Sequence, residues 1–397
     1  MILDEHVGRR TILIEHSVSY VPATIGLDGR RETTVSPVER HTLPGTDYRD
    51  AEVFEAEKKK IFWRNWFCVG RAEQAPEPGD WYTVHVTGES IIVLRGDDMH
   101  LRAFYNVCRH RGSRLREEPS GHDKGSLMCP YHAWCYDMKG DLVATPKVGK
   151  DEVDRSKLSL WPVHLDEWQG FVFVNLNKER PAPLREQLGA AYDDILDFER
   201  FEIDKLRIGA TTEWMVDANW KIMIENYNEC LHCPTVHPEL VDVIPAYRKG
   251  WVFEDGREDG GVTLASGSTY APGVTTLPLI PTMNEIDATS VYGGTIFPNV
   301  FIDISGTSII TTLLFPIAAN RTRQVALYLF HPDTIAAPDF DPSTLVEFGE
   351  LVGGQDNAVC ERVQKGISSQ AFTHGVYPEK DKYVYEFNQR YLRERDS

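Results

Sequence analysis

Two short segments that pair a cysteine with a histidine constrain this chain more than any other feature of its sequence. Cys108 and His110 form a Cys-x-His pair, and after eighteen further residues Cys129 and His132 form a Cys-x-x-His pair. Thiolates and imidazoles are the side chains that hold transition metals most often in proteins. We therefore expect a fold that brings the two segments together as neighbouring loops around one metal site.

Two kinds of metal site use two cysteines and two histidines. In a [2Fe–2S] cluster of the Rieske type, two histidines replace two cysteines on one of the irons. Structural zinc is the alternative, but zinc motifs usually pair cysteine with cysteine across two residues. Here each segment supplies one ligand of each kind, as an asymmetric cluster requires. We favour the Rieske-type cluster, with Cys108, His110, Cys129 and His132 as its ligands, and expect a chain that handles electrons.

The charge balance argues against polyanionic partners. Forty-two basic and sixty acidic residues give a formal net charge of −18 at pH 7. A surface of that sign repels nucleic acid and anionic membranes, so we expect neither as a partner. No apolar run approaches the roughly eighteen residues of a membrane-spanning helix.

The cysteine content predicts a reducing compartment. Seven cysteines spread over 397 residues are an odd number and do not form a disulfide framework. The Arg9-Arg10 pair is not expected to be an export signal, because Glu15 and His16 interrupt the apolar run that such a signal needs. We therefore expect a cytoplasmic protein.

The order of helical and strand patterns predicts an α+β fold. Residues 1–47 lack strong periodicity and are expected to form an N-terminal arm. Short β-rich runs are expected from 81 to 106 and at 170–175, then at 300–304, 308–315 and 324–330. Helical spacing is expected over 50–66, 184–198, 218–229, 345–366 and 382–393. A small β domain followed by mixed strands and helices is typical of α+β proteins.

A second metal site is predicted around His232 and His237. Pro234 and Pro238 end the local helix, so both imidazoles can face one point. Two histidines five residues apart are weak evidence alone, and a structural role for each is as good an explanation. In a chain that already binds an electron relay, two imidazoles and one carboxylate would leave three positions on Fe(II) for oxygen and substrate. Spacing does not identify that carboxylate among sixty acidic residues.

Taken together, these motifs resemble those of the Rieske non-heme iron oxygenases, α-subunit type. The Asn219-Trp220-Lys221 opening and the late Gln355-Asp356 pair belong to the same pattern, which spans roughly residues 45 to 390. The resemblance implies an all-β Rieske domain at 48–165 and a catalytic domain at 166–397, in which a curved antiparallel sheet wraps around helices (helix-grip). It also implies that His232, His237 and Asp356 hold a mononuclear Fe(II), with O2 as co-substrate.

The resemblance further implies a role for Glu229. Family members commonly have an aspartate three residues before the first iron histidine, and it bridges to a Rieske histidine of the neighbouring subunit in a homotrimer. Glu229 keeps that charge, and a carboxylate near a helix C-terminus opposes the helix dipole, which indicates a specific partner. Cys230 and Cys233 overlap His232, and we expect them to be packing thiols rather than a zinc or redox pair.

The run from 225 to 233 most resembles the branch that acts on quaternary ammonium compounds, such as glycine betaine, carnitine, choline and proline betaine. This predicts oxidative N-demethylation of a small, glycine betaine-like molecule with release of formaldehyde. Such a cation needs aromatic faces around it. Trp251, Tyr270, Tyr292, Phe297 and Phe301 lie in the expected region, but the sequence does not select among them. Ring hydroxylation or O-demethylation of an aromatic acid is the alternative.

The chain carries no Gly-x-Gly-x-x-Gly dinucleotide fingerprint. We therefore expect electrons to pass from NAD(P)H through a separate flavin and iron–sulfur reductase. Two other classes stay open at this point. A Rieske ferredoxin would need only about a hundred residues and no second iron, and a zinc-stabilised interaction protein would be colourless.

Overall fold

The computed structural model describes residues 40–149, 151–189, 201–250, 252, 261–265 and 277–397. Most of the N-terminal arm expected over 1–47 therefore lies outside the described residues. Among the described residues, no helix is long and apolar enough to cross a membrane.

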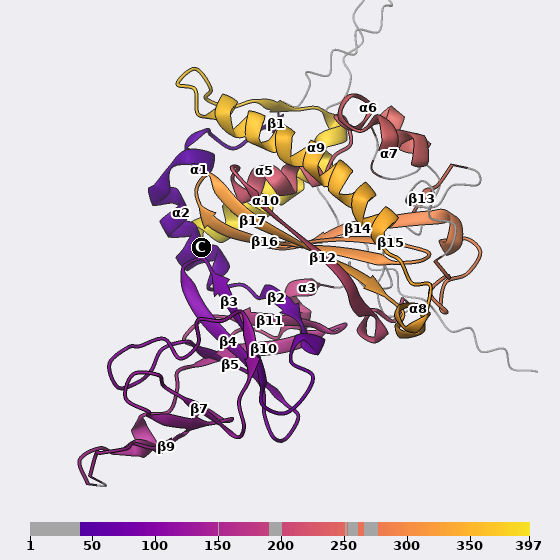
Figure 1. Ribbon diagram of the computed structural model, residues 1–397. Helices are drawn as coiled ribbons and strands as arrows, with labels where there is room; N and C mark the ends of the chain where they lie inside the picture. The colour runs from indigo at the N-terminus through magenta and orange to yellow at the C-terminus, as the bar shows by residue number, and fades with distance from the viewer. Residues whose placement is uncertain (1–39, 150, 190–200, 251, 253–260, 266–276) are drawn as a thin grey trace, which may run out of the picture. The chain divides into compact units, whose positions relative to one another are not determined.

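The first module is built on a seven-stranded antiparallel sheet with the order β2-β11-β10-β5-β4-β3-β6 (Figure 1). Its strands are β2 (Phe67–Arg71), β3 (Asp80–Val86), β4 (Glu89–Arg95), β5 (Leu101–Tyr105), β6 (Ser120–His122), β10 (Pro162–Trp168) and β11 (Phe171–Asn175). A smaller sheet is formed by β7 (Ser126–Met128), β8 (Cys135–Asp137) and β9 (Leu142–Ala144). The loop after β5 and the loop between β7 and β8 carry the two Cys/His pairs.

The sheet continues past the boundary expected between 165 and 166, which falls inside β10. Strand β11 pairs with β10 on one side and with β2 on the other. The first module thus reaches Asn175, because β11 is fully buried between its two neighbours.

The second module contains a six-stranded antiparallel sheet with the order β12-β17-β16-β15-β14-β13. Its strands are β12 (Arg207–Val216), β13 (Val262–Thr263), β14 (Ser290–Ile296), β15 (Val300–Ser305), β16 (Ile309–Ala318) and β17 (Arg321–Phe330). The three runs that the sequence predicts in this region correspond to β15, β16 and β17. The long strand β12 was not predicted: Val216 is its only buried residue, so no regular alternation of apolar and polar residues marks it in the sequence.

Three helices accompany this sheet: α5 (Trp220–Tyr227) and α9 (Ser343–Ile367) contact its strands, and α10 (Lys382–Asp396) packs against α5. Leu345 and Phe348 of α9 pack with Tyr328 and Phe330 of β17, so α9 covers one face of the sheet (Figure 1). A curled antiparallel sheet with helices beside a separate β module confirms the expected α+β, helix-grip architecture (Figure 1).

The remaining elements are short. They are β1 (Arg40–His41), α1 (Thr46–Arg49), α2 (Ala51–Glu57), η1 (Lys58–Phe62), η2 (Ala72–Gln74), η3 (Arg155–Lys157), α3 (Leu184–Leu188), η4 (Ile203–Lys205), α6 (Cys233–Val236), α7 (Pro238–Val243), η5 (Pro245–Lys249), η6 (Asp287–Thr289), α8 (Pro332–Ala336), β18 (Val376–Tyr377) and η7 (Glu379–Asp381). The helix expected over 50–66 is divided into α2 and η1, and only the first turn of the one expected over 184–198 is described, as α3.

The Asn-Trp-Lys motif has a structural explanation. The side chain of Asn219 accepts a hydrogen bond from the backbone N–H of Lys221 and so caps α5. Trp220 Nε1 and Lys221 Nζ both donate to the carboxylate of Glu57, at 2.9 and 2.5 Å. All four residues are buried, and a buried charge pair persists only when its partners are satisfied in this way. The motif therefore fixes the start of the helix that leads into the metal site.

Candidate metal centres and substrate cavity

The two loops with the Cys/His pairs have matching backbone conformations. The N–H of Gly112 donates to the carbonyl of Cys108, and the N–H of Ala133 donates to the carbonyl of Cys129, both at 3.0 Å. Gly112 and Ala133 both have positive φ, 74° and 56°. Each loop thus closes a tight turn four residues after its cysteine, which presents the intervening histidine.

The side chains of the four predicted cluster ligands lie in two pairs, the histidines together and the cysteines together. The rings of His110 and His132 have centroids 4.6 Å apart, and His110 stacks on Trp134 at 4.6 Å with an interplanar angle of 9°. Cys108 and Cys129 are both buried, whereas His110 is exposed. Thiols inside and imidazoles toward the surface fit a Rieske-type cluster, in which one iron carries the cysteines and the other the histidines. The structure brings these residues together, and their roles as ligands stay a prediction.

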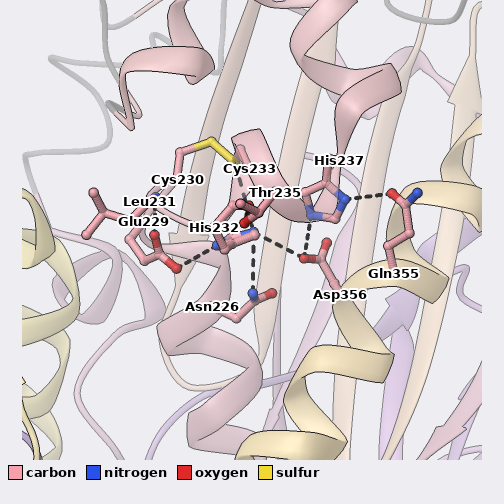
Figure 2. The surroundings of a disulfide bond; sticks show 10 residues. All are labelled: Asn226, Glu229, Cys230, Leu231, His232, Cys233, Thr235, His237, Gln355 and Asp356. Atoms are coloured by element: carbon pink, nitrogen blue, oxygen red, sulfur yellow. Dashed lines mark hydrogen bonds and ion pairs between the residues drawn. A yellow bond between two sulfur atoms is a disulfide. The ribbon is translucent and has the colours of Figure 1, made fainter.

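His232, His237 and Asp356 also meet at one point (Figure 2). Oδ1 of Asp356 lies 2.8 Å from Nε2 of His237 and 3.3 Å from Nε2 of His232. His232 precedes α6, His237 lies between α6 and α7, and Asp356 lies in the middle of α9. Their ligand atoms all lie within 4.8 Å of one another, so the three can hold one metal ion. Two imidazoles and one carboxylate are the donor set of non-heme Fe(II) oxygenases.

Outer partners turn both imidazoles toward this point. Nδ1 of His237 lies 2.7 Å from Oε1 of Gln355, and Nδ1 of His232 lies 2.6 Å from Oε1 of Glu229. An acceptor at Nδ1 fixes the tautomer in which Nε2 is free to bind a metal. Burial lowers the pKa of His232, but hydrogen bonds to Asp356 and Glu229 outweigh it and raise the pKa to about 9. The site therefore concentrates negative charge where a cation would sit.

Cys230 and Cys233 are joined by a disulfide bond, which corrects the expectation of two packing thiols (Figure 2). The bond is possible because the chain turns sharply from Cys230 into α6, which leaves the two Cα atoms 5.0 Å apart. Both residues are buried and pack against Val241. His232 thus lies inside a small covalent loop, which limits how far this metal-facing imidazole can move.

A cavity of about 590 Å³ adjoins the three residues. Its walls come from α5, η5, α9, α10 and the strands of the second sheet. Three of the aromatic residues considered from the sequence line it, namely Tyr292, Phe297 and Phe301. Trp251 and Tyr270 lie outside the described residues. The sequence did not single out Tyr227 or Asp303, whose side chains hydrogen-bond to each other inside the cavity at 2.8 Å.

Fold and site together define a two-centre oxidoreductase, with an electron relay in one module and a mononuclear metal beside a cavity in the other. The chain matches the family described as "Ring hydroxylating alpha subunit (catalytic domain)" over residues 193–395. It matches "Rieske [2Fe-2S] domain" over residues 65–163. The chain belongs to the α subunits of the Rieske non-heme iron oxygenases.

Named relatives cover nearly the whole chain. The glycine betaine monooxygenase oxygenase subunit of Chromohalobacter salexigens is 30% identical over 378 residues, which cover 87% of this chain and 83% of the relative. The carnitine monooxygenase oxygenase subunit of Escherichia coli is 30% identical, with coverages of 85% and 87%. The crystal structure of the quaternary ammonium Rieske monooxygenase CntA with L-carnitine superposes with a TM-score of 0.72 at 25% identity, over 89% of this chain and 96% of that one.

Family membership confirms the cofactors that the sequence predicts. Enzymes of this family use a Rieske [2Fe–2S] cluster, a mononuclear non-heme iron and O2. The ferredoxin and zinc-protein alternatives are therefore excluded. Both donor sets described above suit these groups, because each offers the right ligand types at neighbouring positions.

Proposed function

We propose that this oxygenase removes a methyl group from a small quaternary ammonium compound that also carries a carboxylate, such as glycine betaine or carnitine. The relatives named for these two substrates support the class. The cavity supplies the observation that carries the proposal, because it joins aromatic faces and an acidic side chain, Asp303, with two guanidinium groups, Arg390 and Arg393. A zwitterion needs the aromatic and acidic groups for its cation and the guanidinium groups for its carboxylate. The only charge on an aromatic acid is its carboxylate, which needs the guanidinium groups alone.

The aromatic lining suits the ammonium end of such a substrate. The rings of Tyr227 and Phe301 stack in parallel, with centroids 4.5 Å apart and an interplanar angle of 4°. Both line the cavity, beside Tyr292 and Phe297. A methylated ammonium ion cannot donate a hydrogen bond, so it is stabilised by ring faces and by a counter-charge rather than by hydrogen-bond acceptors.

When bound, the mononuclear iron supplies oxygen activation and the Rieske cluster supplies single electrons. His232, His237 and Asp356 would hold the iron at the cavity wall, with Gln355 fixing the His237 tautomer. The cavity lining would hold one N-methyl group near that wall and keep water away from it. Hydroxylation of the methyl group, with two electrons and two protons per O2, gives water and an N-hydroxymethyl ammonium. Its C–N bond then breaks to give formaldehyde, the tertiary amine and a proton.

We place Glu229 on the path of the electrons. Its Oε1 already contacts His232, and only 17% of its side chain is exposed. In the proposal, Glu229 also contacts a Rieske histidine of a second subunit. The subunits would form a head-to-tail trimer, because a heterologous interface can close into a ring. A structure of CntA is described as revealing inter-subunit electron transfer, which supports this arrangement. A separate flavin and iron–sulfur reductase would supply the electrons from NAD(P)H.

Formaldehyde release tests the proposed function. The purified protein, loaded with both metals and coupled to a compatible reductase, should release formaldehyde from glycine betaine or L-carnitine in step with O2 consumption. Vanillate and benzoate, which are aromatic acids without a cation, should release none and gain no hydroxyl group. Turnover of the aromatic acids with no product from any betaine would establish the alternative reaction and refute this proposal.

A further inference from the structure

Asp303 differs from the other acidic side chains of the cavity. Four acidic residues of the described part of the chain line the cavity, counting Asp303: Glu229, Asp303, Asp356 and Glu386. Glu229 and Asp356 hydrogen-bond to the histidines of the metal site, and Glu386 is exposed beside a lysine. Asp303 makes no ion pair with any residue that the structure describes. Among the described residues, Asp303 is therefore the cavity carboxylate that has neither a cationic side chain nor a metal-site histidine as its partner.

The hydrogen bonds of Asp303 leave one oxygen available. Oδ1 accepts from the hydroxyl of Tyr227 at 2.8 Å. Oδ2 accepts no hydrogen bond from the described part of the chain. The side chain keeps an intermediate accessibility, whereas its neighbours Ile302 and Ile304 on β15 are buried. Since Asp303 lines the cavity, its carboxyl group is accessible from there.

A glycine lies opposite Asp303 and close to Tyr227. Gly293 of β14 is the register partner of Asp303 on β15. A Cβ atom at Gly293 would lie 3.1 Å from Oη of Tyr227 and 3.6 Å from Oδ1 of Asp303. A side chain at this position would crowd the Tyr227 hydroxyl, so glycine lets Tyr227 approach β14 closely and keep its hydrogen bond to Asp303.

An unpaired carboxylate in such a place is costly. Burial raises the pKa of Asp303 to about 7, although the hydrogen bond from Tyr227 lowers it, and the negative charge of Asp356 adds to the increase. A charge removed from water is stabilised by hydrogen bonds and, more strongly, by a partner of opposite charge. A quaternary ammonium group can be that partner, because it keeps its charge at every pH and needs no hydrogen-bond acceptor.

We propose that Asp303 is the counter-ion for the substrate's quaternary ammonium group, and that Tyr227 and Phe301 form the aromatic wall of the same subsite. This inference rests on the proposed function and deepens it. Asp303 would then determine specificity, because its carboxylate favours a cation over a neutral group of the same shape. It would also repel the ring or carboxylate of an aromatic acid from this part of the cavity.

The test compares a cation with its carbon isostere. Glycine betaine and 3,3-dimethylbutanoate have the same shape and carboxylate, but only the first carries a positive charge. Anaerobic calorimetric titration of the metal-loaded enzyme should give a Kd about 30-fold lower for glycine betaine, roughly 2 kcal/mol. In Asp303→Asn the two Kd values should come within about threefold of each other, with the cluster spectrum and iron content unchanged.

Two further variants make the result decisive. Asp333→Asn, at a side chain that is 95% exposed on α8, should keep the wild-type preference. Asp303→Glu keeps the charge and should keep part of the preference, which separates loss of charge from loss of packing. Preserved discrimination in Asp303→Asn overturns the inference, as does a wild-type enzyme that binds the isostere as tightly as the cation.

The outcomes also separate the inference from the proposed function. If Asp303→Asn loses discrimination but no betaine yields formaldehyde with the wild-type enzyme, the cation subsite stands and the demethylation proposal fails. If formaldehyde is released and Asp303→Asn still discriminates, the demethylation proposal stands and the role of Asp303 fails.

Discussion

The Oε1 atom of Gln355 lies 2.7 Å from Nδ1 of His237, on the side of the ring opposite Asp356. The Nε2 of Gln355 donates to Glu239 at 3.1 Å, which fixes the amide with its oxygen toward the histidine. Gln355 and Asp356 are adjacent on α9, so one turn of helix supplies both a metal-facing carboxylate and the group that orients a second ligand.

Gln355→Ala should therefore weaken the binding of the mononuclear iron without loss of the [2Fe–2S] cluster. Loss of a group that orients a metal ligand typically costs about 10–100-fold in metal affinity. Competition with an iron chelator should show that loss, while absorption by the cluster stays unchanged. Gln355→Glu retains an acceptor at this position and should bind iron more tightly than the alanine variant. Equal iron retention in all three proteins would contradict the orienting role.

Replacing His110 or His132 with alanine should abolish the Rieske absorption and electron paramagnetic resonance signals while the protein stays folded. Each imidazole would be one of only two protein ligands on its iron, so no other side chain compensates for its loss. Cys135→Ala is the matched control, because its thiol lies near the second loop and contacts the carbonyl of Ala133 instead. An intact spectrum in either histidine variant, or a lost one in the Cys135 variant, would show that the ligand set is wrong.

Much of this architecture could be predicted because its signals are local. Each Cys/His pair lies within a single tight loop, and the two histidines predicted to bind iron lie on either side of one short helix, α6. Asp356 could be identified only through the resemblance, since nothing in the surrounding helix distinguishes it from other acids. Its position relative to His237 depends on where α9 crosses the sheet.

The pairing of Asp303 with Tyr227 in the cavity could not be predicted, for a different reason. Asp303 lies in an apolar run that is typical of a core strand. Its proposed role depends on its contact with Tyr227, which is 76 residues away on α5. The position of Gly293 opposite Asp303 becomes visible only when β14 and β15 are paired in register. The disulfide between Cys230 and Cys233 likewise depends on the turn into α6 and not on the Cys-x-x-Cys spacing alone.

Arg390→Gln should impair substrates that carry a carboxylate more than those that do not. The guanidinium of Arg390 lies 4.3 Å from the ring centroid of Phe297, and both residues line the cavity. Charge-assisted hydrogen bonds to a carboxylate are among the stronger ones, so the KM for glycine betaine should rise about tenfold, roughly 1.4 kcal/mol. The KM for choline, which has a hydroxyl instead, should change less than twofold. The exposed Arg362 of α9 provides a control as Arg362→Gln, and equal effects on both substrates would rule out a carboxylate clamp.

Glu229→Gln tests the electron path between subunits. The substitution keeps the size of the side chain and its contact with His232, but it removes the charge that would pair with a protonated Rieske histidine of the neighbouring subunit. Both metals should remain bound, and the reduced cluster should still form. In single-turnover stopped-flow experiments, oxidation of the cluster in the presence of O2 and glycine betaine should slow by at least tenfold. Asp242→Asn, at an exposed side chain on the neighbouring helix α7, should transfer electrons at the wild-type rate. A wild-type rate in Glu229→Gln, or an active enzyme that sediments as a monomer, would refute the bridge, because either result would mean that electrons reach the iron without crossing a subunit boundary through this carboxylate.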